Sequence, residues 1–183
     1  MSILVPADIT SEILSWKPDL AKQGDELGST PLHYAASDGN SNIVRLLIGR
    51  TPLAAYEQDK EGFTPLHIAA WMGHVEVICD VLEACPDAAE VLDKKARNFV
   101  HVAIERGHEP VVRYVAANPF LTGMVNEQDR DGNTPLHSAI IAGNPNLAIL
   151  DSRIVELNIA DNEGRMPFDL ASKISSFLYM VKS

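Results

Sequence analysis

One tetrapeptide, Thr-Pro-Leu-His, recurs at nearly constant spacing along this 183-residue chain. It begins at residues 30, 64 and 134, and altered copies, Asn-Phe-Val-His and Met-Pro-Phe-Asp, begin at residues 98 and 166. Successive copies are separated by 34, 34, 36 and 32 residues. Self-similarity at a period of about 20–50 residues indicates an array of structural units, each of which buries its apolar face against its neighbours. The chain is therefore expected to fold as a stack of repeats.

The second copy shows most clearly how one unit is built. Its Gly62 suits a tight turn with positive φ, while Thr64 and Pro65 are typical of a helix N-cap and of the first helical position. The short helix that follows ends at Gly73, and a second helix ends at Pro86. The apolar positions predicted to face inward are Leu66, Ala69 and Ala70 on the first helix, and Val75, Ile78, Val81 and Leu82 on the second.

The other copies preserve the positions that shape this unit. Turn aspartates recur at Asp25, Asp59, Asp93, Asp129 and Asp161, helix-ending glycines at Gly39, Gly73, Gly107 and Gly143, and prolines at the far ends of second helices at Pro18, Pro52 and Pro86. The proline series predicts that residues 8–21, with Ile9, Ile13 and Leu14, form the second helix of a repeat whose first half is missing. We therefore expect an incomplete N-terminal repeat (an outer helix) at 1–24, repeats at 25–58 and 59–92, a divergent repeat at 93–128, a repeat with a shortened outer helix at 129–160, and an incomplete C-terminal repeat at 161–183.

Both ends of the sequence thus fall inside a repeat. A repeat array normally finishes with polar capping units, because an uncapped end exposes the face intended for the next repeat. Such a face is expected near the C-terminus, at Phe177, Leu178, Met180 and Val181. We expect the chain to be a fragment, a short isoform or the soluble part of a longer protein.

Over nearly its whole length, this pattern resembles that of ankyrin-repeat proteins. The motif residues that carry the resemblance are Thr30, Pro31, Leu32, His33, Thr64, Pro65, Leu66, His67, His101, Thr134, Pro135, Leu136 and His137. The resemblance implies an all-α solenoid of stacked helix-turn-helix units with β-turn or hairpin loops. It also implies a non-enzymatic protein–protein interaction module that binds its partner on a concave surface made of the inner helices and the turn tips.

A narrower resemblance concerns the style of the repeats. Asp-Leu-Ala-Lys-Gln at 19–23, Cys-Pro-Asp-Ala-Ala at 85–89, Arg-Asn-Phe-Val-His at 97–101 and the closing segment 161–171 are similar to plant ankyrin proteins of the accelerated-cell-death type. That family implies defence or stress signalling at membranes, with a C-terminal domain of several membrane helices after the repeats. This chain contains no such domain, so membrane association is expected only of a longer form.

Composition and charge restrict the classes of partner. The net charge of −10 and the isoelectric point near 4.9 disfavour nucleic acid and anionic lipid as ligands. No apolar run approaches the roughly 18 residues that a membrane helix needs, and the N-terminus does not resemble a signal peptide. Cys79 and Cys85 lie six residues apart on one predicted helix and face different sides, so they are expected to be reduced thiols. Another protein as partner and a cytoplasmic location are the resulting expectations.

Four histidines occupy the same repeat position: His33, His67, His101 and His137. Packed helices lie roughly 8–10 Å apart, whereas the nitrogens that share a zinc ion lie about 2.1 Å from it. Stacked copies are therefore not expected to share a metal. Instead, each imidazole should bond its turn to its own or the next repeat, as the resemblance implies.

The remaining chemistry gives no positive case for catalysis or for a cofactor. His74 and His108 are expected to start second helices, because Gly73 and Gly107 separate them from the preceding motif histidines. No histidine lies in a recognisable setting with a nucleophilic Ser or Cys and an orienting acid, and no phosphate-binding loop occurs.

Positions that the repeat pattern leaves variable indicate where a partner binds. With Leu66 at 0° on the short helix, Trp71 and Met72 fall at about 140° and 240°, away from the apolar stripe. The equivalent pairs are Ser37/Asp38, Glu105/Arg106 and Ile141/Ala142. We predict an apolar anchor beside a basic ledge, suited to a peptide with a hydrophobic residue followed by acidic ones. The predicted partner-binding residues are Phe63, Trp71, Met72, Lys94, Lys95, Arg97 and Arg106.

A structural alternative remains open at this stage. Trp71 and Met72 would then cover the seam between adjacent short helices, and residues 94–97 would form a solvated turn.

The third and fourth repeats depart from the pattern. Ala96 replaces the turn glycine, Asn98 and Phe99 replace Thr-Pro, and two extra residues lengthen the exit loop near 119–124. In the fourth repeat, Asn-Pro-Asn at 144–146 and Asp151 interrupt the outer helix. We expect this half to open first, since neighbouring interfaces stabilise repeat arrays.

Two other functions are compatible with the sequence. The chain would be the cytosolic portion of a membrane-anchored signalling or channel-like protein if apolar helices follow Ser183. An enzyme that uses repeats for targeting would require an appended catalytic domain.

Overall fold

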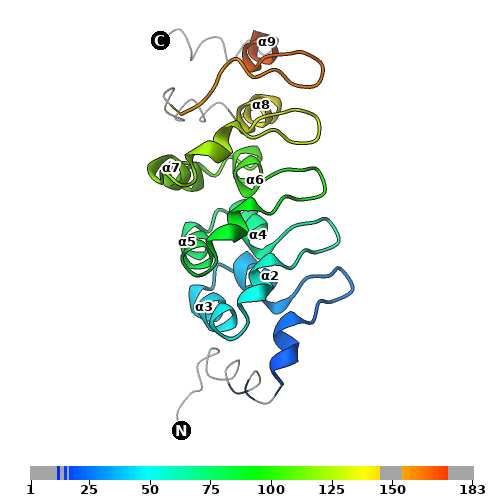
Figure 1. Ribbon diagram of the computed structural model, residues 1–183, viewed down its shortest axis with the longest axis vertical. Helices are drawn as coiled ribbons and strands as arrows, with labels where there is room; N and C mark the ends of the chain where they lie inside the picture. Colours follow the sequence, from blue (N-terminus) through cyan, green and yellow to red (C-terminus); the bar gives the residue numbers. More distant parts are fainter. Residues whose placement is uncertain (1–11, 13–14, 16, 145–153, 173–183) are drawn as a thin grey trace. The chain divides into compact units, whose positions relative to one another are not determined.

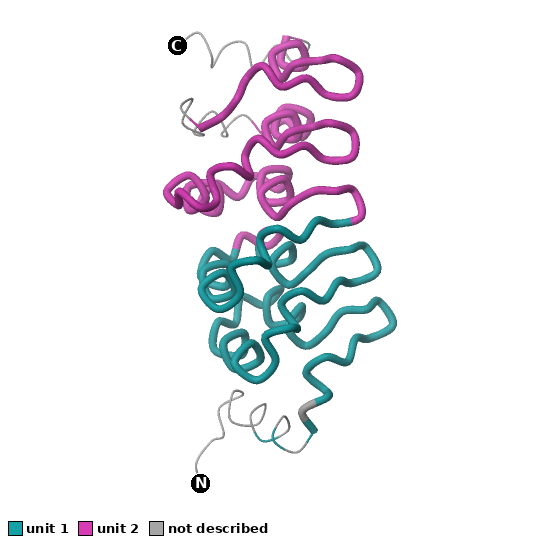
Figure 2. Tube along the Cα trace, in the orientation of Figure 1, with its two compact units in different colours: residues 1–69, 74–93 teal, residues 70–73, 94–183 magenta. Residues whose placement is uncertain are grey.

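The computed structural model describes residues 12, 15, 17–144 and 154–172, and these belong to two compact units (Figure 2). Unit 1 comprises Met1–Ala69 and His74–Asp93, and unit 2 comprises Ala70–Gly73 and Lys94–Ser183. In the described part of each unit, the chain forms helices and turns and no strand. The expected all-α class is therefore confirmed.

Unit 1 is built from short helices, which Figure 1 labels along the chain. They are η1 (Pro18–Lys22), α2 (Pro31–Ser37), α3 (Ser41–Arg50), η2 (Pro52–Tyr56), the first five residues of α4 (Pro65–Met72), α5 (Val75–Ala84) and η3 (Pro86–Glu90), where η denotes a 3-10 helix. The inner helix α2 packs against the outer helix α3, and α3 packs against α5.

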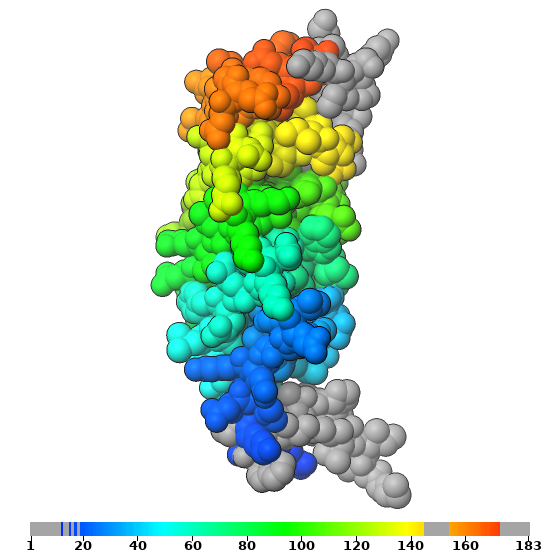
Figure 3. Space-filling model, turned by 90° about the vertical axis from the view of Figure 1, so that its right-hand side faces the viewer, coloured from blue at the N-terminus to red at the C-terminus, as the bar shows by residue number. Residues whose placement is uncertain are grey.

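Unit 2 repeats the same arrangement. It contains the end of α4, then α6 (Phe99–Glu105), α7 (Glu109–Ala117), η4 (Thr122–Asn126), α8 (Pro135–Ile141) and α9 (Pro167–Ser172). The inner helices α6, α8 and α9 pack in that order, and the outer helix α7 packs against α6. Within unit 2 the turns project on one side of the inner helices, the side that faces the viewer in Figure 3.

Small residues allow the inner helices to approach one another closely. Ala69 and Ala70 on α4 are fully buried, as predicted. On α5, Ile78, Val81 and Leu82 are buried as predicted, but Val77 is buried while Val75 is only half-buried. The inward face of this outer helix therefore lies slightly further around the helix than the apolar spacing predicted.

The prolines at the far ends of the outer helices start further helices, which the sequence did not predict. Pro52 begins η2 and Pro86 begins η3. The residue before a proline is disfavoured in the α region, and Thr51 and Cys85 accordingly have φ values of −147° and −139°. The α-helix stops there, and proline, with its fixed φ, opens the 3-10 turn.

Several expectations concern residues outside the described part of the chain. These are the helical residues Ile9, Ile13 and Leu14, the interrupted outer helix with Asp151, and the C-terminal apolar residues Phe177, Leu178, Met180 and Val181. No helix in the described residues is long and apolar enough to cross a membrane.

Candidate partner-binding site

The four motif histidines, called here the frame histidines (His33, His67, His101 and His137), are buried and hydrogen-bonded. The backbone N–H of Thr30 donates to Nδ1 of His33 at 3.1 Å, so this nitrogen is an acceptor and the proton resides on Nε2. Nε2 then donates to the Phe63 carbonyl at 2.9 Å, in the next turn of unit 1. Thr134 and His137 repeat the arrangement, with Nε2 3.1 Å from the Arg165 carbonyl oxygen. The predicted structural role is thus confirmed.

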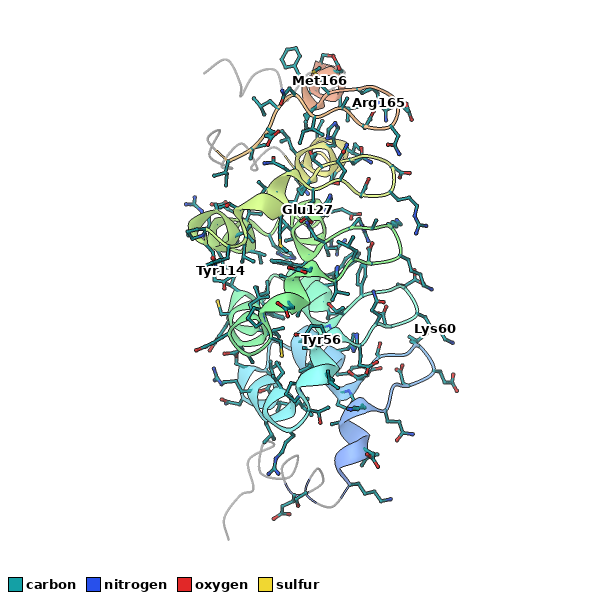
Figure 4. The ribbon with its side chains drawn as sticks, viewed as in Figure 1. Tyr56, Lys60, Tyr114, Glu127, Arg165 and Met166 are labelled. Atoms are coloured by element: carbon teal, nitrogen blue, oxygen red, sulfur yellow. The ribbon has the colours of Figure 1, made fainter. Side chains whose placement is uncertain are left out.

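The frame histidine of the third repeat has different surroundings, because Asn98 replaces threonine. Oδ1 of Asn98 accepts the N–H groups of Val100 and His101 at 3.0 and 3.1 Å and therefore caps α6. Its Nδ2 donates to the Met124 carbonyl and to Oε2 of Glu127, which is labelled in Figure 4. The sequence suggested that this substitution would weaken the repeat. Instead, Asn98 caps α6 and links it to η4.

Burial lowers the pKa values of His33 and His101 below 6.5, against the opposing effect of carbonyls and carboxylates nearby. Desolvation disfavours the charged imidazolium form. For His33, the neutral ring is also the form that its hydrogen bonds require. These side chains therefore serve the fold.

The histidines that start the second helices join each repeat to the repeat before it. His74 Nε2 lies 3.0 Å from the Ser37 carbonyl oxygen in unit 1, and His108 Nε2 lies 2.7 Å from that of Trp71 in unit 2. Their rings occupy the space beside Gly39 and Gly73, where an added Cβ would lie 2.8 and 2.5 Å from Nδ1 of the respective histidine. The glycines end the inner helices, as predicted; they also have positive φ and leave room for a ring.

These bonds hold the C-terminal ends of the inner helices of unit 2 beside one another. His108 joins the loop after α6 to the end of α4. In the next repeat, Nδ2 of Asn144 donates to the carbonyls of Ile104 and Glu105 at 3.2 and 2.8 Å, which joins the loop after α8 to the end of α6. Side chains at the three helix ends are therefore held on one surface.

We call this surface the helix-end platform and define it as Trp71, Met72, Arg106 and Ile141, all in unit 2. The guanidinium carbon of Arg106 lies 4.1 Å from the ring centroid of Trp71, within cation–π distance. Trp71 is half-buried, whereas Met72 and Ile141 are 44% and 58% exposed. Met72 and Ile141 thus provide accessible apolar surface, and Trp71 provides a base for Arg106.

Arg106 differs from the arginines that are engaged in ion pairs. Arg45, Arg97, Arg113 and Arg165 each contact a carboxylate. Within the described residues, the exposed guanidinium of Arg106 stacks on Trp71 and makes neither a hydrogen bond nor an ion pair. Its N–H donors are therefore available to a ligand.

The other predicted site residues differ in their exposure and in their contacts. Lys94 and Lys95 are exposed on the turn before α6. Arg97 is buried and forms an ion pair with Glu105, so the prediction that it belongs to an exposed basic ledge is wrong: its charge is neutralised inside the repeat. Phe63 lies in unit 1, half-buried and stacked on His67 at a ring distance of 5.6 Å.

Sequence reasoning missed Ile141 as a site residue. Its position was recognised as equivalent to Trp71, but the neighbouring Ala142 and the polar residues of other copies obscured its exposure. A comparison of single positions down the repeats, instead of residue pairs, would have grouped Trp71 with Ile141.

Comparison with known families identifies the repeats. A family model for ankyrin repeats (three copies) matches residues 6–90, and a second, for ankyrin repeats (many copies), matches residues 100–151. No curated protein matches the chain.

Proposed function

Since the chain is an ankyrin-repeat protein over residues 6–90 and 100–151, we propose that it is a non-enzymatic protein–protein interaction module whose partner binds the helix-end platform. Ankyrin repeats themselves support an interaction role. The platform and the turn that carries Lys94 and Lys95 form the proposed contact surface. We place this activity in the cytosol.

One observation carries this proposal: the residues that define the repeat are engaged in internal bonds, while apolar residues at variable positions are exposed. Met72 and Ile141 leave 44% and 58% of their surface in water. Burial of apolar surface contributes about 25 cal/mol per Å², and interface hot spots are enriched in Trp and Arg. A partner that covers the platform gains this energy without disturbing the repeats.

The environment of the frame histidines supports a non-enzymatic function. In His33 and His137, Nδ1 accepts a hydrogen bond from the backbone N–H of a threonine, and Nε2 donates to a backbone carbonyl. Such a ring cannot accept a proton from a substrate without losing a buried hydrogen bond. Their recurrence along the chain is therefore explained by packing.

The proposal is tested by replacing exposed apolar residues in two places. A partner captured from native extract is purified, and its affinity is measured for the wild-type chain, for Met72→Ser and for Phe120→Ser. Phe120 is 95% exposed on the loop after α7 and is the matched control. We expect Met72→Ser to weaken binding about five- to twentyfold, in keeping with loss of one buried apolar contact, while Phe120→Ser leaves it unchanged.

Thermal melting of both variants checks that folding is intact. Equal affinities for wild type and Met72→Ser would show that the partner binds elsewhere. A large fall in melting temperature without a change in affinity would instead favour a purely structural role for this residue.

The resemblance of segments 19–23, 85–89, 97–101 and 161–171 to plant accelerated-cell-death proteins supports a more specific context. In that context the chain is the cytosolic ankyrin portion of a membrane-anchored signalling or channel-like protein that acts in defence or stress responses. The test is the full-length transcript. Apolar segments of membrane-spanning length after Ser183 support this candidate, and a stop codon directly after Ser183 in all transcripts excludes it.

A further inference from the structure

We propose that the partner presents an acidic segment, in which one carboxylate is received by Arg106 and separate apolar side chains near it cover Met72 and Ile141. This inference rests on the proposed function, because it names the chemistry of the partner that the helix-end platform binds.

The stack on Trp71 prepares Arg106 to bind a carboxylate. A guanidinium that lies over an aromatic face directs its N–H donors outward in its own plane. With 4.1 Å between the guanidinium carbon and the ring centroid, one face of Arg106 is covered, and its edges remain open. Planar guanidinium edges match a carboxylate through two parallel hydrogen bonds. The donors have no carboxylate partner among the described residues, so they are available for one from outside.

The ring beneath Arg106 is itself held in position. Nε2 of His108 donates to the Trp71 carbonyl at 2.7 Å, and Nδ2 of Asn144 donates to the Glu105 carbonyl at 2.8 Å. The backbone on both sides of the stacked pair is therefore fixed before a ligand arrives. Preorganisation of this kind reduces the ordering cost of binding.

Charge along the turns favours the same kind of ligand. The turn at 93–97 carries three basic side chains and one aspartate, whereas each of the other four turns (25–29, 59–63, 129–133 and 161–165) carries two acidic side chains and at most one basic one. Arg97 is neutralised by Glu105, so the exposed charges near this turn come from Lys94 and Lys95. On a chain with a net charge of −10, an acidic segment is attracted here and repelled by the other turns.

The distance between the turn that carries Lys94 and Lys95 and the guanidinium of Arg106 defines the spacing of acidic residues in the partner. The turn and Arg106 lie at opposite ends of α6, whose seven residues rise about 10 Å. An extended segment covers that length with about three or four residues. We therefore expect acidic residues at both ends of a short stretch that contains an apolar residue.

Selection from a displayed library of random peptides tests the inference without knowledge of the natural partner. The selected peptides are synthesised, and their dissociation constants are measured for the wild-type chain, Arg106→Gln and Arg113→Gln. Arg113 is exposed on α7 in the same unit and is the matched arginine control. We expect an excess of acidic and apolar residues in the selected peptides, and binding that is about tenfold weaker in Arg106→Gln but unchanged in Arg113→Gln.

Charge reversal at Lys94 and Lys95 should also lower the affinity for these peptides and reduce the salt dependence of their binding. Melting curves check that every variant is folded. Peptides without an acidic excess, or peptides that bind Arg106→Gln as tightly as wild type, overturn the inference but leave the proposed function in place. The absence of any selected peptide contradicts both proposals. A single-stranded nucleic acid that binds with the same dependence on Arg106 overturns the assignment of the ligand to an acidic protein segment.

Discussion

Ala96 shows how one substitution within a repeated turn affects stability. Among the described residues, it is the non-glycine residue with positive φ, 58°, at the position where the other turns have Gly28, Gly62, Gly132 and Gly164. A side chain in the left-handed region costs about 1–2 kcal/mol. The loss of glycine was visible in the sequence, and the structure shows that the turn keeps its conformation despite the strain.

Ala96→Gly should therefore stabilise the chain. The gain is about 0.5–1.5 kcal/mol, because relief of strain exceeds the extra entropy that glycine adds to the unfolded state. Urea unfolding measures it. Ala117→Gly, at the exposed end of α7, is the control and should give no gain. An Ala96→Gly variant no more stable than wild type would show that the turn is not strained.

His33 makes the stability of unit 1 dependent on pH. Burial keeps its folded pKa below 6.5, so the unfolded chain binds a proton at pH values where the folded ring stays neutral. The free energy of unfolding should therefore fall as pH falls below 6.5. Unfolding at about pH 7.5 and 5.5 should show a smaller pH dependence in His33→Gln than in wild type. An NMR titration in which the His33 midpoint lies above 6.5 would contradict the assigned tautomer and its cause.

Much of this chemistry was predictable from the sequence because it repeats. The frame histidines share one position in the repeat, so one inference served all four. The burial of Arg97 was not predictable in the same way, because its partner Glu105 lies at the other end of the helix and has no equivalent acidic residue in the other copies. The repeat pattern thus predicts the features that the copies share and says little about the features that distinguish them.

For the helices and the turns that end them, glycines have two separable roles. Gly73 and Gly143 both have positive φ, 81° and 69°, but only Gly73 has a histidine ring in the space of its missing side chain. Gly123 has neither constraint among the described residues. Alanine substitutions at these three positions in unit 2 therefore separate conformational strain from steric overlap.

We expect graded losses of stability across this series. Gly123→Ala should change the free energy of unfolding by no more than about 0.5 kcal/mol, and Gly143→Ala should lower it by about 1–2 kcal/mol. Gly73→Ala should cost at least 1 kcal/mol or so more, because its Cβ would displace His108 from the Trp71 carbonyl. Equal losses in Gly73→Ala and Gly143→Ala, measured by urea unfolding, would show that the ring contact contributes nothing.

The ends of the α-helices were predicted better than the short 3-10 helices that come after them. Glycine and proline each mark the end of a helix by a local conformational rule, so the stops after α3, α4 and α5 could be read from the chain. The 3-10 helices η2 and η3 could not, because a proline is compatible both with a loop and with the first position of a new helix. In the structure η3 buries Ala88 and Ala89, which favours the new helix over a loop.

In the chain as a whole, structure and proposed function depend on different residues. Thr, His and Asn side chains at recurring positions are occupied by bonds within the units, and glycines at recurring positions have positive φ. The proposed binding surface lies at positions where the copies differ, and the helical angle of Trp71 and Met72 was the basis for proposing it from the sequence. The contribution of Ile141 and the stacking of Arg106 on Trp71 required the packing of neighbouring helices, which the sequence does not specify.

Amide hydrogen exchange, with and without a selected acidic peptide, tests this division of roles most directly. We predict that the peptide slows exchange at the helix ends and loops of unit 2, at residues 70–73, 105–108 and 141–144, and leaves the outer helices α5 and α7 unchanged. Slower exchange concentrated on α5 or α7, with none at the inner-helix ends, would contradict this assignment.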